Sequence, residues 1–187
     1  MIDFLLEWLL VLKRELQTIF YIQPPLKWNH GSKGDVILIH GFNETWVFLE
    51  TLGNFLNEKG YRVHTLPMLG RNFLPIEDAV TLINTYLHKQ GIIKVIFLSH
   101  SKGGLIGKKL VDEDAPNRHL ISIATPFHGT FWGKARVLNL ETLDPLSASI
   151  QSLHISKKNK TITNIYSKHD TLVFPNSSLF LKGASNY

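Results

Sequence analysis

The stretch Ile96-Phe97-Leu98-Ser99-His100-Ser101-Lys102-Gly103-Gly104 decides the fold of this chain. It begins within an apolar run, residues 94–98, whose β-branched side chains are typical of a fully buried strand. Small residues end the run abruptly. A helical spacing of apolar residues follows at once, at Leu105, Ile106, Leu110 and Val111. The sequence therefore predicts a strand that turns sharply into a helix, with Ser101 at the apex of the turn.

A serine in such a turn is well placed for chemistry. The turn raises the Ser101 hydroxyl out of the sheet, and the helix behind it directs free backbone N–H groups and the positive end of its dipole at the same point. The crowded positions two before and two after the serine need small side chains, which Ser99 and Gly103 provide. For these five residues alone two interpretations stay open: a nucleophile, or a turn rich in serine and glycine that performs no chemistry.

Ser99-His100-Ser101-Lys102-Gly103 resembles the Gly-x-Ser-x-Gly nucleophile elbow of the α/β-hydrolase fold, in its bacterial lipase and esterase branch. Position 99 departs from the pattern, because serine replaces the first glycine and adds a hydroxymethyl group at a crowded site. The resemblance implies Ser101 as the catalytic nucleophile and an α/β fold whose mostly parallel sheet has helices on both faces. Strand and helix patterns alternate along the chain as such a sheet requires. Helices are expected at 45–59, 75–90 and 144–154, and further strands at 61–66, 118–124 and 161–166.

A second marker follows another apolar strand pattern, at residues 35–40, which runs into His40-Gly41-Phe42-Asn43. In α/β-hydrolases a strand that ends in His-Gly carries half of the oxyanion hole. The resemblance therefore implies two oxyanion donors, the backbone N–H groups of Phe42 and of Lys102, the residue after the nucleophile. Such donors contribute about 3 kcal/mol each to lowering the barrier. We expect His40 itself to be a strand-end histidine that is hydrogen-bonded to the backbone.

Two further segments resemble loops that surround the active site in this family. Thr125-Pro126-Phe127-His128-Gly129-Thr130 is similar to the Thr-Pro-x-x-Gly-Thr turn of lipases, which borders the acyl pocket, and His128 is expected to fix this loop. Residues 131–141 stand where the family inserts its lid. An ordinary covered loop is an equally open interpretation of that segment. Its candidate pocket residues are Trp132, Val137, Leu138 and Leu140.

The acid of the catalytic triad is expected after the strand pattern at 161–166. The family places it in the pattern Asp-x-x-Val followed by proline, and Asp170, Val173 and Pro175 match that pattern. The acid holds the catalytic imidazole in one tautomer and stabilises its protonated form. A solvated turn aspartate is the alternative. The order of the elbow, the His-Gly pair and the Thr-Pro turn favours Asp170 as the triad acid.

The histidine of the triad is missing from its expected place. The chain order of an α/β-hydrolase triad is serine, acid, histidine, yet residues 171–187 contain no histidine. We therefore expect a C-terminally truncated hydrolase domain that lacks its last strand and helix and hydrolyses esters poorly. The alternatives are a hydrolase-fold protein that binds lipid without catalysis, or a membrane-associated protein. Nothing in the sequence favours another histidine as the base; the candidates are His100, His128, His154 and His169.

Residues 1–25 stand outside this resemblance, and residues 26–187 are expected to form the hydrolase domain. The first segment is mostly apolar, and its polar residues Asp3, Glu7, Arg14 and Thr18 share one side of a helix. It lacks the features of a signal peptide, and the charged residues 13–15 break the apolar run short of a membrane span. Two interpretations stay open: an amphipathic helix packed on the domain, or an interfacial anchor that makes peripheral membrane contact through residues 1–22.

Composition narrows the remaining function classes. The 187 residues suffice for one domain with a real core, and a hydrophobic content of 44% is ordinary for a globular protein. The chain has no cysteine, which excludes disulfides, a thiol nucleophile and thiolate metal sites, and fits a reducing compartment such as the cytoplasm. The net charge of +5 is scattered, so nucleic-acid binding is not indicated. The expected partner is a small-molecule ester or lipid, and the expected reaction uses no cofactor and no metal.

Overall fold

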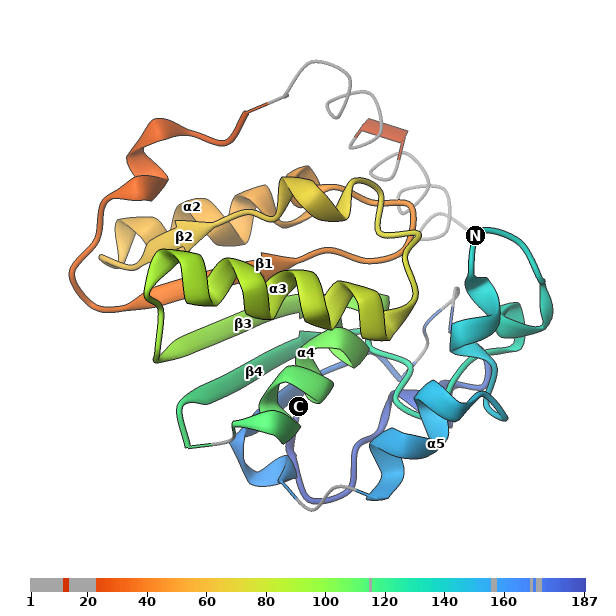
Figure 1. Cartoon of the computed structure of the whole chain (residues 1–187). Coiled ribbons are helices and arrows are strands. Elements are labelled where there is room, and N and C mark those ends of the chain that lie inside the picture. Colours follow the sequence, from red (N-terminus) through yellow and green to blue (C-terminus); the bar gives the residue numbers. More distant parts are fainter. Residues whose placement is uncertain (1–11, 14–22, 115, 156–157, 169, 171–172) are drawn as a thin grey trace.

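The computed structural model describes residues 12–13, 23–114, 116–155, 158–168, 170 and 173–187. Their strands form one six-stranded sheet in the order β2-β1-β3-β4-β5-β6, and every neighbouring pair is parallel (Figure 1). The strands are β1 (Asp35–Ile39), β2 (Arg62–His64), β3 (Val95–His100), β4 (Arg118–Ile123), β5 (Ile162–Ile165) and β6 (Ser185–Asn186). The parallel α/β architecture that the sequence predicts is confirmed.

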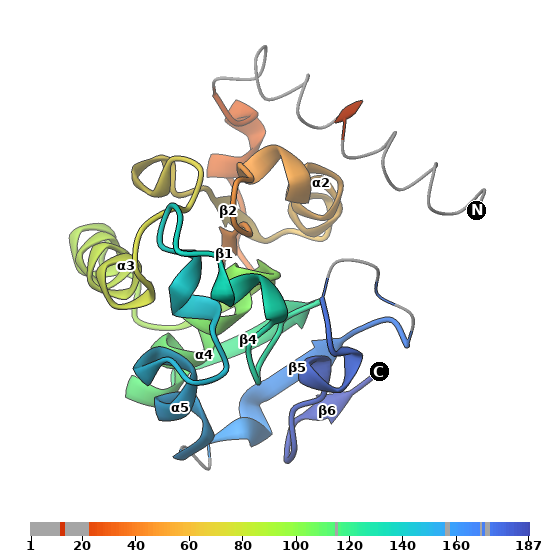
Figure 2. The same ribbon diagram turned by 90° about the vertical axis from the view of Figure 1, so that its right-hand side faces the viewer.

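Helices lie on both faces of this sheet. The α-helices are α2 (Glu50–Glu58), α3 (Ile76–Gln90), α4 (Lys102–Glu113) and α5 (Ala148–Ile155). Short 3-10 helices are η1 (Leu26–Asn29), η2 (Trp46–Leu49), η3 (Pro67–Leu69), η4 (Phe131–Lys134), η5 (Leu140–Leu143), η6 (Asn159–Thr161) and η7 (Asn176–Leu179). Helices α3, α4 and α5 pack on one face, whereas α2 lies on the other face with η1 and η2 (Figure 2).

The two sides of β1 show how the sheet divides the core. Val36 and Leu38 pack with the tryptophan of η1 on the side of α2, whereas Ile37 and Ile39 pack with the residues of α3 and α4. This alternation is the period of a β-strand, and all four side chains are completely buried. A strand covered on both faces needs the continuous apolar run that the sequence has at this position.

The predicted helices at 75–90 and 45–59 are both present, the second in two parts. α3 ends where Gly91 takes a φ of 65°, the left-handed conformation that glycine commonly adopts after the last residue of a helix. The segment 45–59 first forms the 3-10 helix η2 and becomes α-helical only over Glu50–Glu58. The apolar spacing therefore located both helices, but it did not indicate the 3-10 geometry of the first turn of the segment 45–59.

The predicted helix at 144–154 begins later than its pattern indicates. The Asp144 carboxylate accepts a backbone N–H two residues ahead, which makes a turn instead of the first helical turn. The Ser147 hydroxyl then accepts the N–H of Ile150 at 3.2 Å, so the regular helix starts at Ala148. The predicted start of the helix at residue 144 is therefore wrong, because local side-chain hydrogen bonds compete with the helix at residues 144–147.

The sheet ends with a short strand close to the point where the resemblance implies that the last strand is missing. Ser185 and Asn186 pair with Thr163 and Asn164 of β5, so two residues of a sixth strand are present. A buried polar network holds this edge. Nδ2 of Asn164 donates to Oδ1 of Asn186 at 2.9 Å, and the Ser122 hydroxyl donates to Oδ1 of Asn164 at 2.9 Å. Side-chain hydrogen bonds of amide and hydroxyl groups thus link β4, β5 and β6 to one another.

Most of the predicted N-terminal helix, residues 1–11 and 14–22, lies outside the described residues. Leu12 and Lys13 are described as α-helical, with exposed side chains. Within the described part of the chain, no helix has both the length and the apolar character needed to cross a bilayer. Both interpretations of this segment, a helix packed on the domain and an interfacial anchor, stay open at this point.

Candidate active site

Ser101 occupies the turn between β3 and α4. Its backbone has a φ of 51° and a ψ of −123°, a conformation that residues with a side chain rarely adopt. The N–H of Ser101 donates to the carbonyl oxygen of Ile123 at 2.9 Å, and its own carbonyl accepts the N–H of Gly104 at 2.9 Å. Such a backbone costs about 1–3 kcal/mol and persists only where the surrounding structure imposes it. The sharp turn that the sequence predicts is present, and its strain is an additional finding.

Glycines bring the helix of this turn close to its neighbours. A Cβ atom at Gly103 would overlap the carbonyl oxygen of Ile39, and a Cβ atom at Gly104 would overlap the side chain of Thr125. Ser99 is completely buried, and its hydroxyl has no hydrogen-bond partner among the described residues. The elbow therefore accommodates a serine at position 99, although it requires glycine at 103 and 104.

The two expected oxyanion donors, Phe42 and Lys102, lie at the same edge of the sheet. Phe42 comes shortly after β1, and Lys102 comes shortly after β3. All five residues of β1 pair with β3, so these two strands end side by side. Within the described part of the chain, neither backbone N–H donates a hydrogen bond. For Lys102 this follows from its place in the first turn of α4, where N–H groups have no partner in the helix.

The side chain of Lys102 has a role that the sequence patterns do not indicate. It is completely buried, and its Nζ donates to the carbonyl oxygens of Asn72 at 2.9 Å and Leu74 at 2.6 Å. Burial lowers the pKa of Lys102 to about 8, and the carboxylate of Glu141 opposes this shift. The same Nζ lies 5.6 Å from the centre of the Phe42 ring. One buried amine thus ties the loop after β2 and the loop after β1 to the elbow.

Glu44 is a second residue of this edge that no motif marked. Its Oε2 accepts the N–H of Gly41 at 2.7 Å, and its Oε1 lies 2.8 Å from Nδ1 of His100. Burial acts to lower the pKa of His100, but the carboxylates of Glu44 and, beyond it, Asp170 act against burial, and the pKa is raised. The Glu44 carboxylate therefore links the His-Gly loop to the residue that precedes the elbow serine.

His40 has the structural role that the sequence predicts. Its Nε2 lies 3.0 Å from the carbonyl oxygen of Gly70, so this nitrogen carries the proton and donates it. Burial lowers the pKa of His40 to about 4, although the charge of Glu44 and this hydrogen bond oppose the shift. The carbonyl of His40 also accepts from Nδ2 of the buried Asn72 at 2.6 Å. A neutral His40 therefore holds the loop at 67–72 against the end of β1.

The segment after the Thr-Pro turn bridges two other loops of this edge. The N–H of Phe131 donates to the carbonyl of Phe174 at 2.9 Å, and Nδ2 of Asn139 donates to the carbonyl of Phe73 at 3.1 Å. Of the candidate pocket residues, Leu140 packs against the core, whereas the other three are exposed. The exposed apolar side chains of these loops are Phe131, Trp132, Val137, Leu138 and Phe174.

No protein-family model and no curated protein that was compared with this sequence matches it. Solved structures do resemble it. A monoacylglycerol lipase of Paleococcus ferrophilus gives a TM-score of 0.62 at 17% identity, over 83% of this chain and 83% of its own. An α/β-hydrolase enzyme from a sediment metagenome of the Mar Chica lagoon in Morocco gives 0.60 at 17% identity, over 84% and 80% of the two chains. A Bacillus licheniformis lipase in its mature form gives 0.57 at 14% identity, over 88% and 84%.

The chain has the α/β-hydrolase fold. In this fold Ser101 and Asp170 lie at the same edge, because Ser101 follows β3 and Asp170 follows β5, with β4 between these strands. Oδ1 of Asp170 accepts the N–H of Val173 at 2.8 Å, a contact of the kind that turn aspartates make. The charge of Asp170 also acts on His100. Asp170 therefore makes the hydrogen bond of a turn aspartate at the edge where this fold would carry a triad acid.

Among the residues that the structure describes, no histidine is hydrogen-bonded to Ser101. There, the Ser101 hydroxyl has no hydrogen-bond partner. His128 has an exposed side chain, and its backbone N–H donates to Ser178 at 3.3 Å, which anchors the loop. His169 and the side chain of His154 lie outside the described residues. Within those residues, no group of three histidine, aspartate or glutamate side chains is arranged to hold a metal ion.

Proposed function

We propose that this protein is a serine carboxylic-ester hydrolase of the lipase and esterase type. Ser101 is the nucleophile, Asp170 is the acid, and the N–H groups of Phe42 and Lys102 are the oxyanion donors. The observation that carries the proposal is the strained, positive-φ backbone of Ser101 between a parallel strand and a helix. The likeness of the fold to a monoacylglycerol lipase and to a second lipase supports an ester as the substrate.

The proposed reaction transfers the acyl group of the ester to Ser101 and then to water. The Ser101 oxygen attacks the carbonyl carbon, and the carbonyl oxygen becomes an alkoxide that two N–H groups and the N-terminus of α4 stabilise. The carbonyl re-forms as the alcohol leaves with the proton from the serine, which gives an acyl-enzyme. Water attacks the same carbon, the acid is released, and a proton returns to the Ser101 oxygen.

The slow step of this reaction is removal of the proton from Ser101. A neutral hydroxyl is a poor nucleophile when no base lies beside it. Loss of one triad member leaves only about 10³–10⁴-fold catalysis over water, which comes from binding and from the oxyanion hole. We therefore propose that residues 1–187 alone hydrolyse esters slowly and that imidazole added to the solution accelerates the reaction.

The exposed apolar side chains beside the elbow favour a substrate with an apolar acyl chain. Phe131 and Phe174 are joined through their backbones and are 58% and 69% exposed, on loops at the edge that carries Ser101. The same surface supports a second candidate function, binding of a lipid without catalysis. The two candidates differ in their need for the Ser101 hydroxyl, because hydrolysis requires it and binding does not.

Hydrolysis of p-nitrophenyl butyrate, with and without imidazole, tests the proposal. We expect slow hydrolysis by the full chain, a faster rate with imidazole, and loss of both in Ser101→Ala after the reaction of imidazole alone is subtracted. Ser99→Ala is the matched control, because Ser99 is buried and has no role in the reaction. Hydrolysis that survives Ser101→Ala unchanged excludes Ser101 as the nucleophile. Fatty-acid binding without any hydrolysis by the parent chain supports the second candidate.

A further inference from the structure

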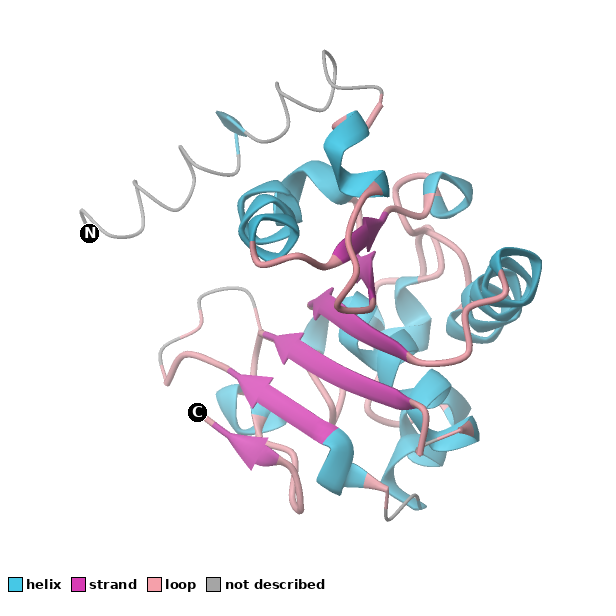
Figure 3. Cartoon of the chain, turned by 90° about the vertical axis from the view of Figure 1, so that its left-hand side faces the viewer, coloured by secondary structure: helices cyan, strands magenta, loops and turns pink. Residues whose placement is uncertain are grey.

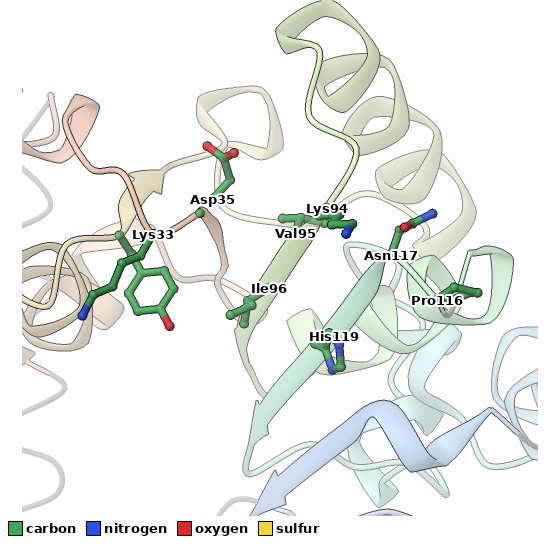
Figure 4. Close-up of a pocket in the computed structure, with 10 residues that line it drawn as sticks. Lys33, Asp35, Lys94, Val95, Ile96, Pro116, Asn117 and His119 are labelled. Atoms are coloured by element: carbon green, nitrogen blue, oxygen red, sulfur yellow. The ribbon is translucent and has the colours of Figure 1, made fainter.

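A hollow of about 310 Å³ lies at the amino ends of β1, β3 and β4 (Figure 4). Ser101 follows the carboxyl end of β3, so the six residues of this strand separate it from the hollow by about 20 Å. Because the strands are parallel, as Figure 3 shows for β3, β4 and β5, the hollow and the elbow lie at opposite edges of the sheet. Its volume is at the lower end of the roughly 300–1,000 Å³ of small-molecule pockets. We call it the amino-end hollow and define it by Lys33, Tyr61, Lys94, Ile96, Asn117 and His119.

One side of the amino-end hollow comes from β3 and β4. Ile96 and His119 are partners in the β3–β4 register, so their side chains lie on the same face of the sheet. This is the face of α2, because Ile96 packs against the core cluster of that side. Lys94, immediately before β3, also lines the hollow, and Figure 4 shows it on the same side of Ile96 as His119. An apolar side chain therefore adjoins two side chains that can carry positive charge.

The opposite wall comes from the segments that precede β1 and β2. The N–H of Lys33 donates to the carbonyl oxygen of Gly60 at 3.0 Å, which holds these segments together, and Tyr61 packs against the core cluster on the side of α2. Figure 4 shows the amine of Lys33 directed away from Ile96. Gly34, which also lines the hollow, has a φ of 138°, and a Cβ atom there would meet no heavy atom within 4 Å. The missing side chain at Gly34 leaves this part of the hollow unfilled.

The polar side chains of the amino-end hollow offer donors without partners. Among the described residues, neither Nζ of Lys94 nor the imidazole of His119 makes a hydrogen bond or an ion pair. The Tyr61 hydroxyl also has no partner in that part of the chain. An amine, an imidazole in either tautomer and a phenol all have an N–H or O–H to donate. These groups are therefore available to a ligand that accepts hydrogen bonds.

The carboxylates beside the amino-end hollow are engaged elsewhere. Oδ1 of Asp35 lies 2.7 Å from Nε of Arg62 and 2.8 Å from Nε2 of His64. These contacts place Asp35 on the α3 face of the sheet, away from Ile96 (Figure 4). The carboxylate of Asp114 accepts from the amide of Asn117 at 3.2 Å. The lining includes two lysines and one paired aspartate, so the charge that it presents to a ligand is positive.

We propose that the amino-end hollow binds a small organic anion, with its carboxylate or phosphate group against Lys94 and His119 and its apolar part over Ile96. Hydrogen bonds from a cationic donor to an anionic acceptor are stronger than neutral ones and orient the ligand. The apolar part of the ligand removes the side chain of Ile96 and the ring of Tyr61 from water. The site is independent of the reaction at Ser101 and stands whether or not the chain hydrolyses esters.

Titration of the full chain with phenyl phosphate and with benzoate, followed by amide NMR, tests the proposal. We expect saturable shifts of the Ile96 and His119 signals. Benzamide is the uncharged analogue of benzoate, and inorganic phosphate lacks the apolar part of phenyl phosphate. Each should bind about tenfold more weakly than its organic anion, because it lacks one of the two recognised features. Tighter binding of phenyl phosphate identifies a phosphate ligand, and tighter binding of benzoate identifies a carboxylate.

Two substitutions connect this binding to the proposed side chains. Lys94→Gln and His119→Gln should each weaken binding about fivefold, since each removes one exposed donor of the anion. The matched control is Lys89→Gln plus His88→Gln, which makes the same changes at exposed positions of α3 on the opposite face. Binding by this control should equal that of the parent. Circular dichroism and thermal unfolding show that every variant is folded, as expected for the replacement of exposed side chains.

Four results overturn the proposal. The first is the absence of saturable shifts at Ile96 and His119 with both organic anions. The second is equal binding by the control and by the double variant Lys94→Gln plus His119→Gln. Benzamide that binds as tightly as benzoate shows that the hollow does not recognise charge. Shifts at Phe42 and Lys102 in place of those at Ile96 and His119 assign the anion to the edge that carries Ser101.

Discussion

The Glu44 carboxylate lies 2.8 Å from Nδ1 of His100, and this pair joins the loop after β1 to the residue before the elbow serine. The other oxygen of Glu44 holds the N–H of Gly41 at 2.7 Å. Phe42, the residue after Gly41, carries one of the proposed oxyanion donors, and the elbow carries the other. Glu44 therefore connects the two halves of the proposed oxyanion hole through a residue that touches neither donor directly.

Glu44→Gln should destabilise the protein more at acidic than at alkaline pH. Because the folded pKa of His100 is raised, the ionised pair stabilises the fold fully below the unfolded pKa of histidine, about 6.5, and this contribution is lost as the pH rises through the folded pKa. We expect a loss of about 1–2 kcal/mol at about pH 5.5 and a smaller loss at about pH 9 in urea unfolding. Glu58→Gln, on an exposed surface, is the control. Equal losses at both pH values would mean that the pair is not ionic.

The pKa of His100 should fall in Asp170→Asn and should fall further in Glu44→Gln. Glu44 contributes a hydrogen bond as well as its charge, whereas Asp170 contributes its charge alone. Titration of the His100 ring protons by NMR measures both shifts, and Asp78→Asn on α3 serves as the remote control. An unchanged pKa in Asp170→Asn would place its carboxylate too far from the elbow for the proposed acid.

Ser101→Gly should stabilise the protein while it abolishes ester hydrolysis. Glycine adopts a φ of 51° without the steric cost that serine bears, so we expect a gain of about 1 kcal/mol. Ser101→Ala removes the hydroxyl but keeps the Cβ atom, and it should therefore lose hydrolysis without that gain. Thermal unfolding of the two variants makes the comparison. If Ser101→Gly proved no more stable than Ser101→Ala, the elbow would store no strain.

Gly103→Ala should destabilise the protein more than Gly104→Ala. The new methyl group at 103 meets the carbonyl oxygen of Ile39, which is part of the backbone of β1, whereas at 104 it meets the side chain of Thr125. We expect a loss of about 3 kcal/mol for Gly103→Ala. Thr125→Ala should restore part of the loss in Gly104→Ala and none of it in Gly103→Ala. Urea unfolding of the single and double variants checks this order, and the reverse order would contradict it.

Lys102→Met should remove a rise in stability that the parent chain shows between about pH 8 and pH 10. The folded pKa of Lys102, about 8, lies below its unfolded value of about 10.4, so in this window the unfolded chain binds a proton that the folded chain does not. Parent stability therefore rises with pH, by up to about 1.4 kcal/mol per unit. From about pH 7.5 to pH 9.5 we expect the parent to gain about 1–2 kcal/mol over Lys102→Met.

Lys89→Met is the matched control for that experiment, because Lys89 is an exposed lysine of α3. Its stability relative to the parent should not change over the same pH range. A parent advantage over Lys102→Met that shrinks as the pH rises would contradict burial of the charged amine.

The sequence allowed the sheet and the elbow to be predicted because their signals are local. The continuous apolar run of β1 and the glycines that follow Ser101 can each be recognised within a few consecutive residues of the sequence. The roles of Lys102 and Glu44 could not be read in this way. Lys102 binds carbonyl groups 28 and 30 positions away, and Glu44 pairs with His100 across 56 positions. Periodicity carries no information on such pairs, which exist only after the sheet has formed.

Asp170 shows where a motif reaches its limit. The pattern Asp-x-x-Val marks a triad acid, yet the same spacing allows its carboxylate to accept the N–H of Val173 in a turn. Sequence alone cannot separate these roles, because one side chain can satisfy both. The late start of α5 has a related cause, since Asp144 and Ser147 satisfy local backbone groups that apolar spacing does not report.

The buried hydrogen bonds among Ser122, Asn164 and Asn186 help to set the register of β6, the edge strand of the sheet. A slip of β6 by one residue would turn Asn186 to the other face, and the Asn164 amide would lose one of its two acceptors and keep the other, the carbonyl of Leu179. A buried hydrogen bond that is lost in this way costs about 1 kcal/mol. A strand of two residues buries too little surface to select its own register. The hydrogen bond between the side chains of Asn186 and Asn164 favours one register instead. The correct alignment of β6 is therefore favoured by the side chain of Asn186.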